Sequence, residues 1–259
     1  MISVVIPFKD AEKYLPRCLN SLTSQEGDFE FIFVDDDSTD NGREIVDSND
    51  DHRIVITDNV KAKGVSGARN TGVAIASGDW VTFLDADDEL LPNAYETFTK
   101  AISEDPFANI IQFNHLRYYA QIDKTAFKYA NNGGAYDCDN LPKCWFGVWN
   151  KLFNADFLKG VKFNEKLNYG EDGLFILDCL AKDNYIHHAG YNDTTVKHYF
   201  DNPKSLSKSK KETDLFKYVK ELETFIKKHK SPTIRWTACK VLSDEWKSTS
   251  FKTIIGKQK

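Results

Sequence analysis

The amino-acid sequence predicts an α/β protein built on a doubly wound sheet, and two observations lead to this prediction. Over the first hundred residues, short apolar runs alternate with segments whose apolar residues recur at helical spacing, in the order β-α-β-α-β-α-β. Acidic or polar residues directly follow three of the apolar runs. In sheets of this class, ligands bind beyond the carboxyl ends of the strands, so these residues form a candidate site.

The strands are predicted from continuous apolar runs that are rich in β-branched and aromatic residues. They are expected at residues 2–8, 29–34, 53–57 and 80–84. Helices are expected between them at residues 11–25, 40–48 and 67–77, the last of which is closed by Gly78. A further helix is expected to carry Pro92 in its first turn.

The second half of the chain is less regular. "ANIIQFNHLRYYA", residues 108–120, alternates like one strand, and the aromatic-rich residues 144–158 run into a helix. "NYGEDGLFILDCLAKD", residues 168–183, places Glu171 and Asp172 just ahead of another helix.

The character of the chain changes near residue 204. Residues 204–230 combine nine lysines and four acidic residues with apolar residues at helical spacing, and a last helix is expected after Pro232. The predicted organisation is one domain over residues 1–205 and a lysine-rich helical extension over residues 206–259.

Composition narrows the functional classes. The chain has 259 residues and a net charge of −5, so no basic field is available to attract nucleic acid. Its five cysteines form no CxxC pair and are odd in number, which favours reduced thiols in a cytoplasmic protein. We expect no signal peptide, because "MISVVIPFKD" lacks a basic leader, and no membrane span, because no apolar window approaches the roughly 18 residues that cross a bilayer.

Two acidic clusters need a physical explanation. "VDDDSTD" carries Asp35, Asp36 and Asp37 after the second strand, and "FLDADD" ends the fourth. Adjacent like charges cost free energy unless a cation or hydrogen-bond donors meet them. Asp85 and Asp87 are two residues apart in an extended segment, so their carboxylates point to the same side. The pattern predicts a hard divalent cation there.

Five motifs occur in order: "VVIPFKD", "VDDDSTDNG", "GVSGARNTGVAIASGD", "FLDADD" and "GED". With them the chain resembles, over roughly residues 1–205, bacterial family 2 glycosyltransferases of the GT-A fold. The resemblance implies a GT-A (Rossmann-like) doubly wound mixed sheet. It also implies inverting transfer of a sugar from a UDP-sugar to a hydroxyl of a glycan, lipid-linked glycan or cell-surface polymer, assisted by Mn²⁺ or Mg²⁺.

The resemblance implies roles for the donor-site residues. Asp36 is expected to accept a hydrogen bond from uracil, because an ionised carboxylate is an acceptor only. Arg69 and Lys63 are expected to reach the nucleotide or its diphosphate. The other donor-binding residues implied are Pro7, Phe8, Lys9, Gly67, Asp85 and Ala86.

Two positions depart from the family pattern. Lys9 replaces the usual tyrosine that stacks on the base, so Phe8 or the aliphatic stem of Lys9 is expected to cover the ring. Asp37 stands where the family usually has glycine.

For the chemistry, the resemblance implies that Asp172 is the general base and that Glu171 either orients this site or reaches the metal. It implies Asp87, Asp85 and His198 as metal ligands. Structural readings remain open beside these: Asp36 as a helix cap, Arg69 in a surface ion pair, and the Glu171–Asp172 pair as an N-cap.

Competing classes lack their sequence signals. A nucleotidyltransferase is expected to carry a G-x-G-T-R-like loop after the first strand and a Rossmann dehydrogenase G-x-G-x-x-G, but "PFKDAEKYL" has neither. A catalytically silent sugar-binding relative is expected to have lost an acidic motif, and both motifs are intact. The lysines of the extension are either solvated or rest on anionic lipid at the inner face of the membrane.

Overall fold

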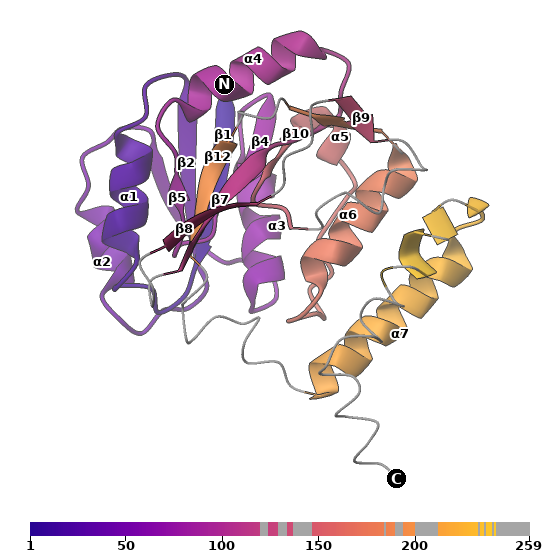
Figure 1. Ribbon diagram of the computed structural model, residues 1–259. Coiled ribbons are helices and arrows are strands. Elements are labelled where there is room, and N and C mark those ends of the chain that lie inside the picture. Colours follow the sequence, from indigo (N-terminus) through magenta and orange to yellow (C-terminus); the bar gives the residue numbers. More distant parts are fainter. Residues whose placement is uncertain are drawn as a thin grey trace.

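The computed structural model describes residues 1–119, 124–128, 134–136, 147–183, 185–189, 194–199, 212–232, 234–235, 237–239 and 241 (Figure 1). The strands are β1 (Ile2–Phe8), β2 (Phe29–Asp35), β3 (Ile54–Asp58), β4 (Trp80–Phe83), β5 (Glu89–Leu90), β6 (Ile110–Gln112), β7 (Asn114–Tyr119), β8 (Lys124–Lys128), β9 (Gly134–Tyr136), β10 (Lys151–Asn154), β11 (Ile186–His188) and β12 (Thr194–Tyr199). The helices are α1 (Leu15–Thr23), α2 (Gly42–Asp47), α3 (Val65–Ile75), α4 (Ala94–Glu104), α5 (Ala155–Leu158), α6 (Glu171–Lys182) and α7 (Glu212–Lys228).

The strands form two sheets. The larger sheet has the order β3-β2-β1-β4-β10-β6-β11-β9, and the smaller one has the order β5-β12-β7-β8. The first four strands of the chain pair in parallel. Strand β10 lies antiparallel between β4 and β6, so the large sheet is mixed. The predicted α/β class with a mixed sheet is therefore confirmed.

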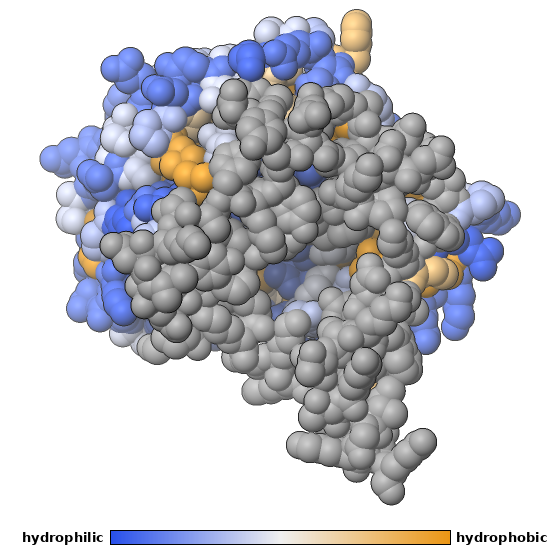
Figure 2. All heavy atoms as spheres, viewed as in Figure 1, coloured by the Kyte–Doolittle hydropathy of each residue, from blue (hydrophilic) through white to orange (hydrophobic). Residues whose placement is uncertain are grey.

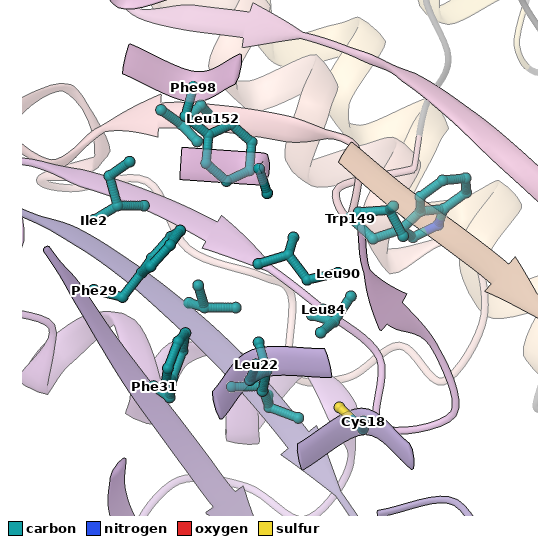
Figure 3. Packing of buried hydrophobic residues seen from close by; sticks show 14 of the residues in the cluster. Ile2, Cys18, Leu22, Phe29, Phe31, Leu84, Leu90, Phe98, Trp149 and Leu152 are labelled. Carbon is teal, nitrogen blue, oxygen red and sulfur yellow. The ribbon is translucent and has the colours of Figure 1, made fainter. Parts of the chain in front are cut away.

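Helices cover both faces of the large sheet, because its central strands are apolar on both sides. The aromatic side chains of β2, Phe29 and Phe31 among them, pack with α1 and α4 on one face (Figure 3). Alternate residues of the same strand, Ile32 and Val34, face the other side and share a core with α3, α6 and α7. This is the doubly wound arrangement expected from the sequence.

The predicted single strand over residues 108–120 is wrong, because the chain changes sheets at Phe113. Strand β6 before it belongs to the large sheet and β7 after it to the small sheet. Asn150 holds this switch: its side-chain amide donates to the Phe113 carbonyl at 2.9 Å, and the Phe113 amide donates to the Asn150 carbonyl at 2.9 Å.

Several predicted helix ends also move: α1 spans residues 15–23 rather than 11–25, α2 spans 42–47 rather than 40–48, and α3 begins at Val65 rather than at residue 67. Helix α4 begins at Ala94 rather than at Pro92, because Asn93 at the N-cap takes a left-handed φ of 61°. Helix α3 ends at Ile75, before Gly78. Gly78 donates its amide to Ser3 Oγ at 2.9 Å and has no room for a side chain.

The C-terminal helix α7 packs on the main domain through its apolar face. Its buried residues are Leu215, Tyr218, Leu222 and Phe225, and the last three belong to the core that contains α6. Its lysines, Lys217, Lys220, Lys227 and Lys228, are exposed. The predicted boundary at residue 205 lies outside the described residues, as do Cys138 and Cys144, whereas the described residues from 232 to 241 are helical as expected.

Among the described residues that Figure 2 shows, hydrophilic side chains dominate and apolar ones form only small groups. None of the helices in the described part of the chain has the length and apolar character needed to cross a bilayer.

Candidate active site

The carboxyl ends of the parallel strands meet at one edge of the large sheet. The register pairs Phe8 at the end of β1 with Asp35 at the end of β2, and the acidic loop after β4 begins beside them. This edge therefore collects the residues that the sequence predicts for the site.

The Asp36 carboxylate accepts hydrogen bonds from two uncharged donors, Asn59 and Gly64, at the start of α3, and these three residues are called the Asp36 ring below. The Gly64 amide donates to both of its carboxylate oxygens, at 3.0 and 2.9 Å, and the Asn59 side chain donates at 2.6 Å. Asp36 is thus held without capping the short helix α2, and its contact with a base stays a prediction. The neighbouring Asp35 accepts the Ser38 amide at 2.9 Å at the end of β2.

Asp37 and Lys63 form an exposed ion pair beside this ring. Asp37 has a φ of 67°, a left-handed conformation that glycine adopts with little cost. This explains in physical terms why glycine is usual at this position. The Lys63 hydrogen bond lowers the pKa of Asp37, so this carboxylate stays ionised.

The buried side chain of Arg69 is the centre of a cluster of three partly buried carboxylates. Its guanidinium donates to Asp172 Oδ1 at 2.5 Å, to Asp85 Oδ1 at 2.9 Å and to Glu171 Oε1 at 3.4 Å. The Arg69 side chain is only 3% exposed, so the alternative of a surface ion pair is wrong. The cluster joins the predicted base to the acidic loop after β4, and a contact of Arg69 with the diphosphate remains a prediction.

Glu171 and Asp172 lie in the first turn of α6, not ahead of the helix, and Gly170 is the N-cap. Acidic side chains are favourable there because the helix dipole places partial positive charge at that end. Burial raises the pKa of Asp172 to about 7; Arg69 lowers it, and Glu171 and Asp85 raise it. A carboxylate with a pKa near neutrality suits a general base at physiological pH.

The acidic loop after β4 has the donor set of a hard cation. Carboxylate oxygens of Asp85, Asp87 and Asp88 all lie within 4.8 Å of one another. Oxygen ligands of this kind suit Mg²⁺ or Mn²⁺, so the residues present fit the metal that the resemblance implies. Asp88 is fully buried and accepts the Tyr199 amide at 2.9 Å, which ties the loop to β12.

Arg17 of α1 also holds the acidic loop, and sequence reasoning missed it. Its guanidinium donates to the Asp87 carbonyl, pairs with Glu89 at 3.2 Å and stacks 3.5 Å from the centre of the Tyr199 ring. Asn59, which sequence reasoning also missed, binds Asp36 from a loop. Neither residue belongs to a motif, so no sequence signal marks it.

The remaining predicted residues differ in how well they suit a ligand. Phe8 is 3% exposed and packs edge-on against Phe33 in the core, so it is not placed to cover a base. Lys9 is exposed and donates to the Asp36 carbonyl at 2.9 Å, which leaves its stem as the candidate. The buried residues Pro7 and Ala86 line the strand ends.

Gly67 and His198 complete the predicted set. A Cβ atom on Gly67 would lie 1.8 Å from the Ala62 carbonyl oxygen, so this position requires glycine for close packing of the loop on α3. The backbone of His198 lies in β12, one residue before the amide that Asp88 accepts. Its side chain lies outside the described part of the structure, so its role as a metal ligand remains a prediction.

Residues 3–148 match the sequence model of the family described as "Glycosyl transferase family 2". This match covers more than half of the chain. The chain belongs to glycosyl transferase family 2.

Curated family 2 relatives are similar over part of their length. "Glycosyltransferase GlyA" of Streptococcus pneumoniae is 32% identical over 66% of this chain and 27% of its own length. A "GalNAc(5)-diNAcBac-PP-undecaprenol beta-1,3-glucosyltransferase" of Campylobacter jejuni is 30% identical over 73% of this chain and 62% of its own length. The chain thus spans between about a quarter and three fifths of these relatives.

Solved structures show the same fold. S. aureus TarS 1–349 in complex with UDP superposes with a TM-score of 0.77 at 19% identity, over 96% of this chain and 72% of that chain. The complex of the same protein with UDP-GlcNAc also has a TM-score of 0.77, at 20% identity, over 90% of this chain and 68% of that chain. The GT-A fold expected from the sequence is therefore confirmed.

Proposed function

We propose that this family 2 protein is an inverting glycosyltransferase that moves a sugar from a UDP-sugar to an acceptor hydroxyl. The observation that carries the proposal is the Arg69 cluster, in which one guanidinium holds Asp172, Glu171 and Asp85 together. The proposed base Asp172 and the donor-binding carboxylate Asp85 must both lie close to the reacting carbon, and this cluster brings them together through Arg69, which lies 102 and 103 residues before Glu171 and Asp172 in the sequence.

The reaction is a single in-line displacement. Asp172 accepts the proton of the acceptor hydroxyl while that oxygen attacks the anomeric carbon, and the nucleoside diphosphate leaves from the opposite face. Arg69 keeps the Asp172 carboxylate oriented, and a positioned base of this kind contributes about 10²–10⁴-fold to the rate. Asp36, Lys63 and Lys9 hold the nucleotide at the ends of β1 and β2.

Asp85 and Asp87 are the residues that would hold Mn²⁺ or Mg²⁺, and His198 is the third ligand we propose. When bound, the cation supplies charge neutralisation on the leaving diphosphate. Asp88 supports the site by fixing the acidic loop to β12.

The relatives support the substrate class. The two TarS complexes contain UDP and UDP-GlcNAc, which supports UDP as the nucleotide and a hexose or N-acetylhexosamine as the sugar. The C. jejuni relative and an E. coli "UDP-Glc:alpha-D-GlcNAc-diphosphoundecaprenol beta-1,3-glucosyltransferase WfgD" act by name on undecaprenol-linked glycans. A lipid-linked or polymeric glycan is accordingly our proposed acceptor.

A screen of UDP-sugars for metal-dependent UDP release tests the proposal and identifies the donor. We expect Asp172→Asn to bind UDP normally and to transfer almost nothing. Asp178→Asn is the matched control, because Asp178 lies on the same helix, also has a pKa raised by burial, and has no contact with Arg69 among the described residues. Near wild-type transfer by Asp172→Asn would assign the base to another residue.

Metal removal tests the acidic loop. We expect Asp87→Ala or EDTA to abolish turnover while the fold persists. Asp79→Ala, at the opposite end of β4 where Asp79 pairs with the N-terminal amine at 3.1 Å, should keep its activity. Full turnover in EDTA would exclude the metal from the reaction.

The exposed lysines of α7 suit contact with anionic lipid, where a lipid-linked acceptor would lie. Each lysine near such a surface contributes about 1 kcal/mol. We expect sedimentation with anionic vesicles that fades as salt rises, and weaker binding when Lys217, Lys220, Lys227 and Lys228 are changed to Gln. Equal recovery in the supernatant with neutral and anionic vesicles would mean that these lysines are only solvated.

A further inference from the structure

Helix α7 contacts the main domain next to the predicted base. The Tyr218 ring, 2% exposed, lies against the Gly170–Gly173 turn that begins α6. A Cβ atom on Gly170 would lie 2.5 Å from the Tyr218 ring, and one on Gly173 would lie 3.0 Å from the Tyr218 hydroxyl. Contacts this close leave room only for glycine at Gly170, so the ring and the turn fit each other directly.

Two more contacts fix Tyr218 and its helix at this place. The Tyr169 ring packs edge-on against Tyr218 with centroids 5.7 Å apart, and the Asn164 side chain donates to Glu221 Oε2 at 3.0 Å. Gly170 has a left-handed φ of 73°, a conformation that directs Glu171 and Asp172 into the first turn of α6. The aromatic ring therefore covers the backbone that sets the direction of both carboxylates.

We propose that Tyr218 is a positioning residue for catalysis, and that α7 is needed to hold Asp172 in register with Arg69. The inference rests on the proposed function, in which Asp172 is the base. Tyr218 acts through the Gly170–Gly173 turn, which carries Glu171 and Asp172, whereas the Asp36 ring proposed to hold the nucleotide is formed with Asn59 and Gly64. A displacement of about 1 Å in a catalytic group costs up to about 10²-fold in rate.

The kinetic constants of Tyr218 variants distinguish a positioning role in catalysis from a general contribution to stability. Tyr218→Ala should lower kcat about 10–100-fold while the donor KM and the affinity for UDP stay near wild type. Tyr218→Phe keeps the ring over the turn and should restore most of kcat. Phe225→Ala is the matched control, because Phe225 is also a buried aromatic residue of α7, 5% exposed, but packs against His229 with centroids 4.1 Å apart.

The experiment measures kcat, KM and UDP affinity for the three variants, Asp172→Asn and the wild type at a temperature where all are folded. If Phe225→Ala lowers kcat as much as Tyr218→Ala, or if Tyr218→Ala keeps kcat, the positioning role is wrong. Should Asp172→Asn also keep its activity, the proposed base is wrong instead, so the two failures are distinguishable. Where Tyr218→Ala does not fold, Tyr218→Leu takes its place with the same expected split between kcat and KM.

Discussion

The Arg69 cluster and the Lys63–Asp37 pair lie at the same edge of the sheet and both join a basic side chain to carboxylates, but they differ in exposure to solvent and in the elements that they connect. In the Arg69 cluster the arginine is 3% exposed and its three carboxylates are 15–31% exposed, whereas Lys63 and Asp37 are 76% and 66% exposed. The first joins residues from α3, α6 and the loop after β4, and the second joins two neighbouring loops.

The comparison teaches that desolvation decides what an ion pair does. The three carboxylates around the buried guanidinium depend on it, because removal of the cation leaves three neighbouring, partly buried charges without their shared partner. An exposed pair gains little, since water and salt screen both charges. We infer that the Arg69 cluster fixes the geometry of the site. The Lys63 side chain, by contrast, can leave Asp37 and bind a phosphate of the donor instead.

The largest effect is expected from Arg69→Ala. It leaves Asp85, Glu171 and Asp172, which are 15–31% exposed, facing one another. Loss of one partner of a fully buried ion pair typically costs about 3–5 kcal/mol, so we expect a loss between about 1 kcal/mol, the upper range of exposed pairs, and that figure. The free energy of unfolding from urea denaturation measures this cost. A loss below about 1 kcal/mol, the range of exposed pairs, would show that the cluster does not support the fold.

The next prediction concerns pH. Asp172 must be ionised to accept a proton, and its pKa is raised to about 7. The value of kcat/KM should therefore fall about tenfold per pH unit below that pKa and level off above it. The exposed pair is not expected to contribute to this fall, because the pKa of Asp37 is lowered by Lys63 rather than raised. Lys63→Ala should therefore leave the fall of kcat/KM at low pH unchanged. A profile that stays flat down to pH 5 would contradict an Asp172 base.

Arg17 is intermediate between the two extremes, with 36% of its side chain exposed. Because it holds the Asp87 carbonyl, Arg17→Ala should raise the Mn²⁺ concentration needed for half-maximal activity about tenfold or more. Arg43→Ala is the control: Arg43 is equally exposed and pairs with Asp35, Asp47 and Asp58 at the neighbouring strand end. Equal shifts in both variants would show a general charge effect.

The smallest effect is expected from Lys63→Ala. The midpoint of urea unfolding should not move, while the donor KM should rise by about tenfold or less, as expected for one lost charged hydrogen bond. Lys61→Ala, another exposed lysine of the same loop, should change neither quantity. If Lys63→Ala destabilised the protein as much as Arg69→Ala, the contrast between the two pairs would disappear.

The sequence predicted the alternating strands and helices of the first hundred residues and which residues form the site, but it did not predict which of those residues contact one another. Apolar runs and helical spacing give β1 to β4 and α1 to α3, because each signal is local. The partners of Arg69 on α6 are more than 100 residues away in sequence, and no local pattern reports such a pairing. The change of sheets at Phe113 was missed for the same reason, since its cause is Asn150.

The insertion of β10 between β4 and β6 has a consequence for biosynthesis. When β4 and β6 have left the ribosome, both still lack the neighbour that residues 151–154 will provide. Unpaired strand edges of apolar sequence associate with other chains, and this hazard is greatest in partly folded intermediates. Nascent chains that stop before β10 should therefore aggregate or bind chaperones, and those that include it should close the sheet.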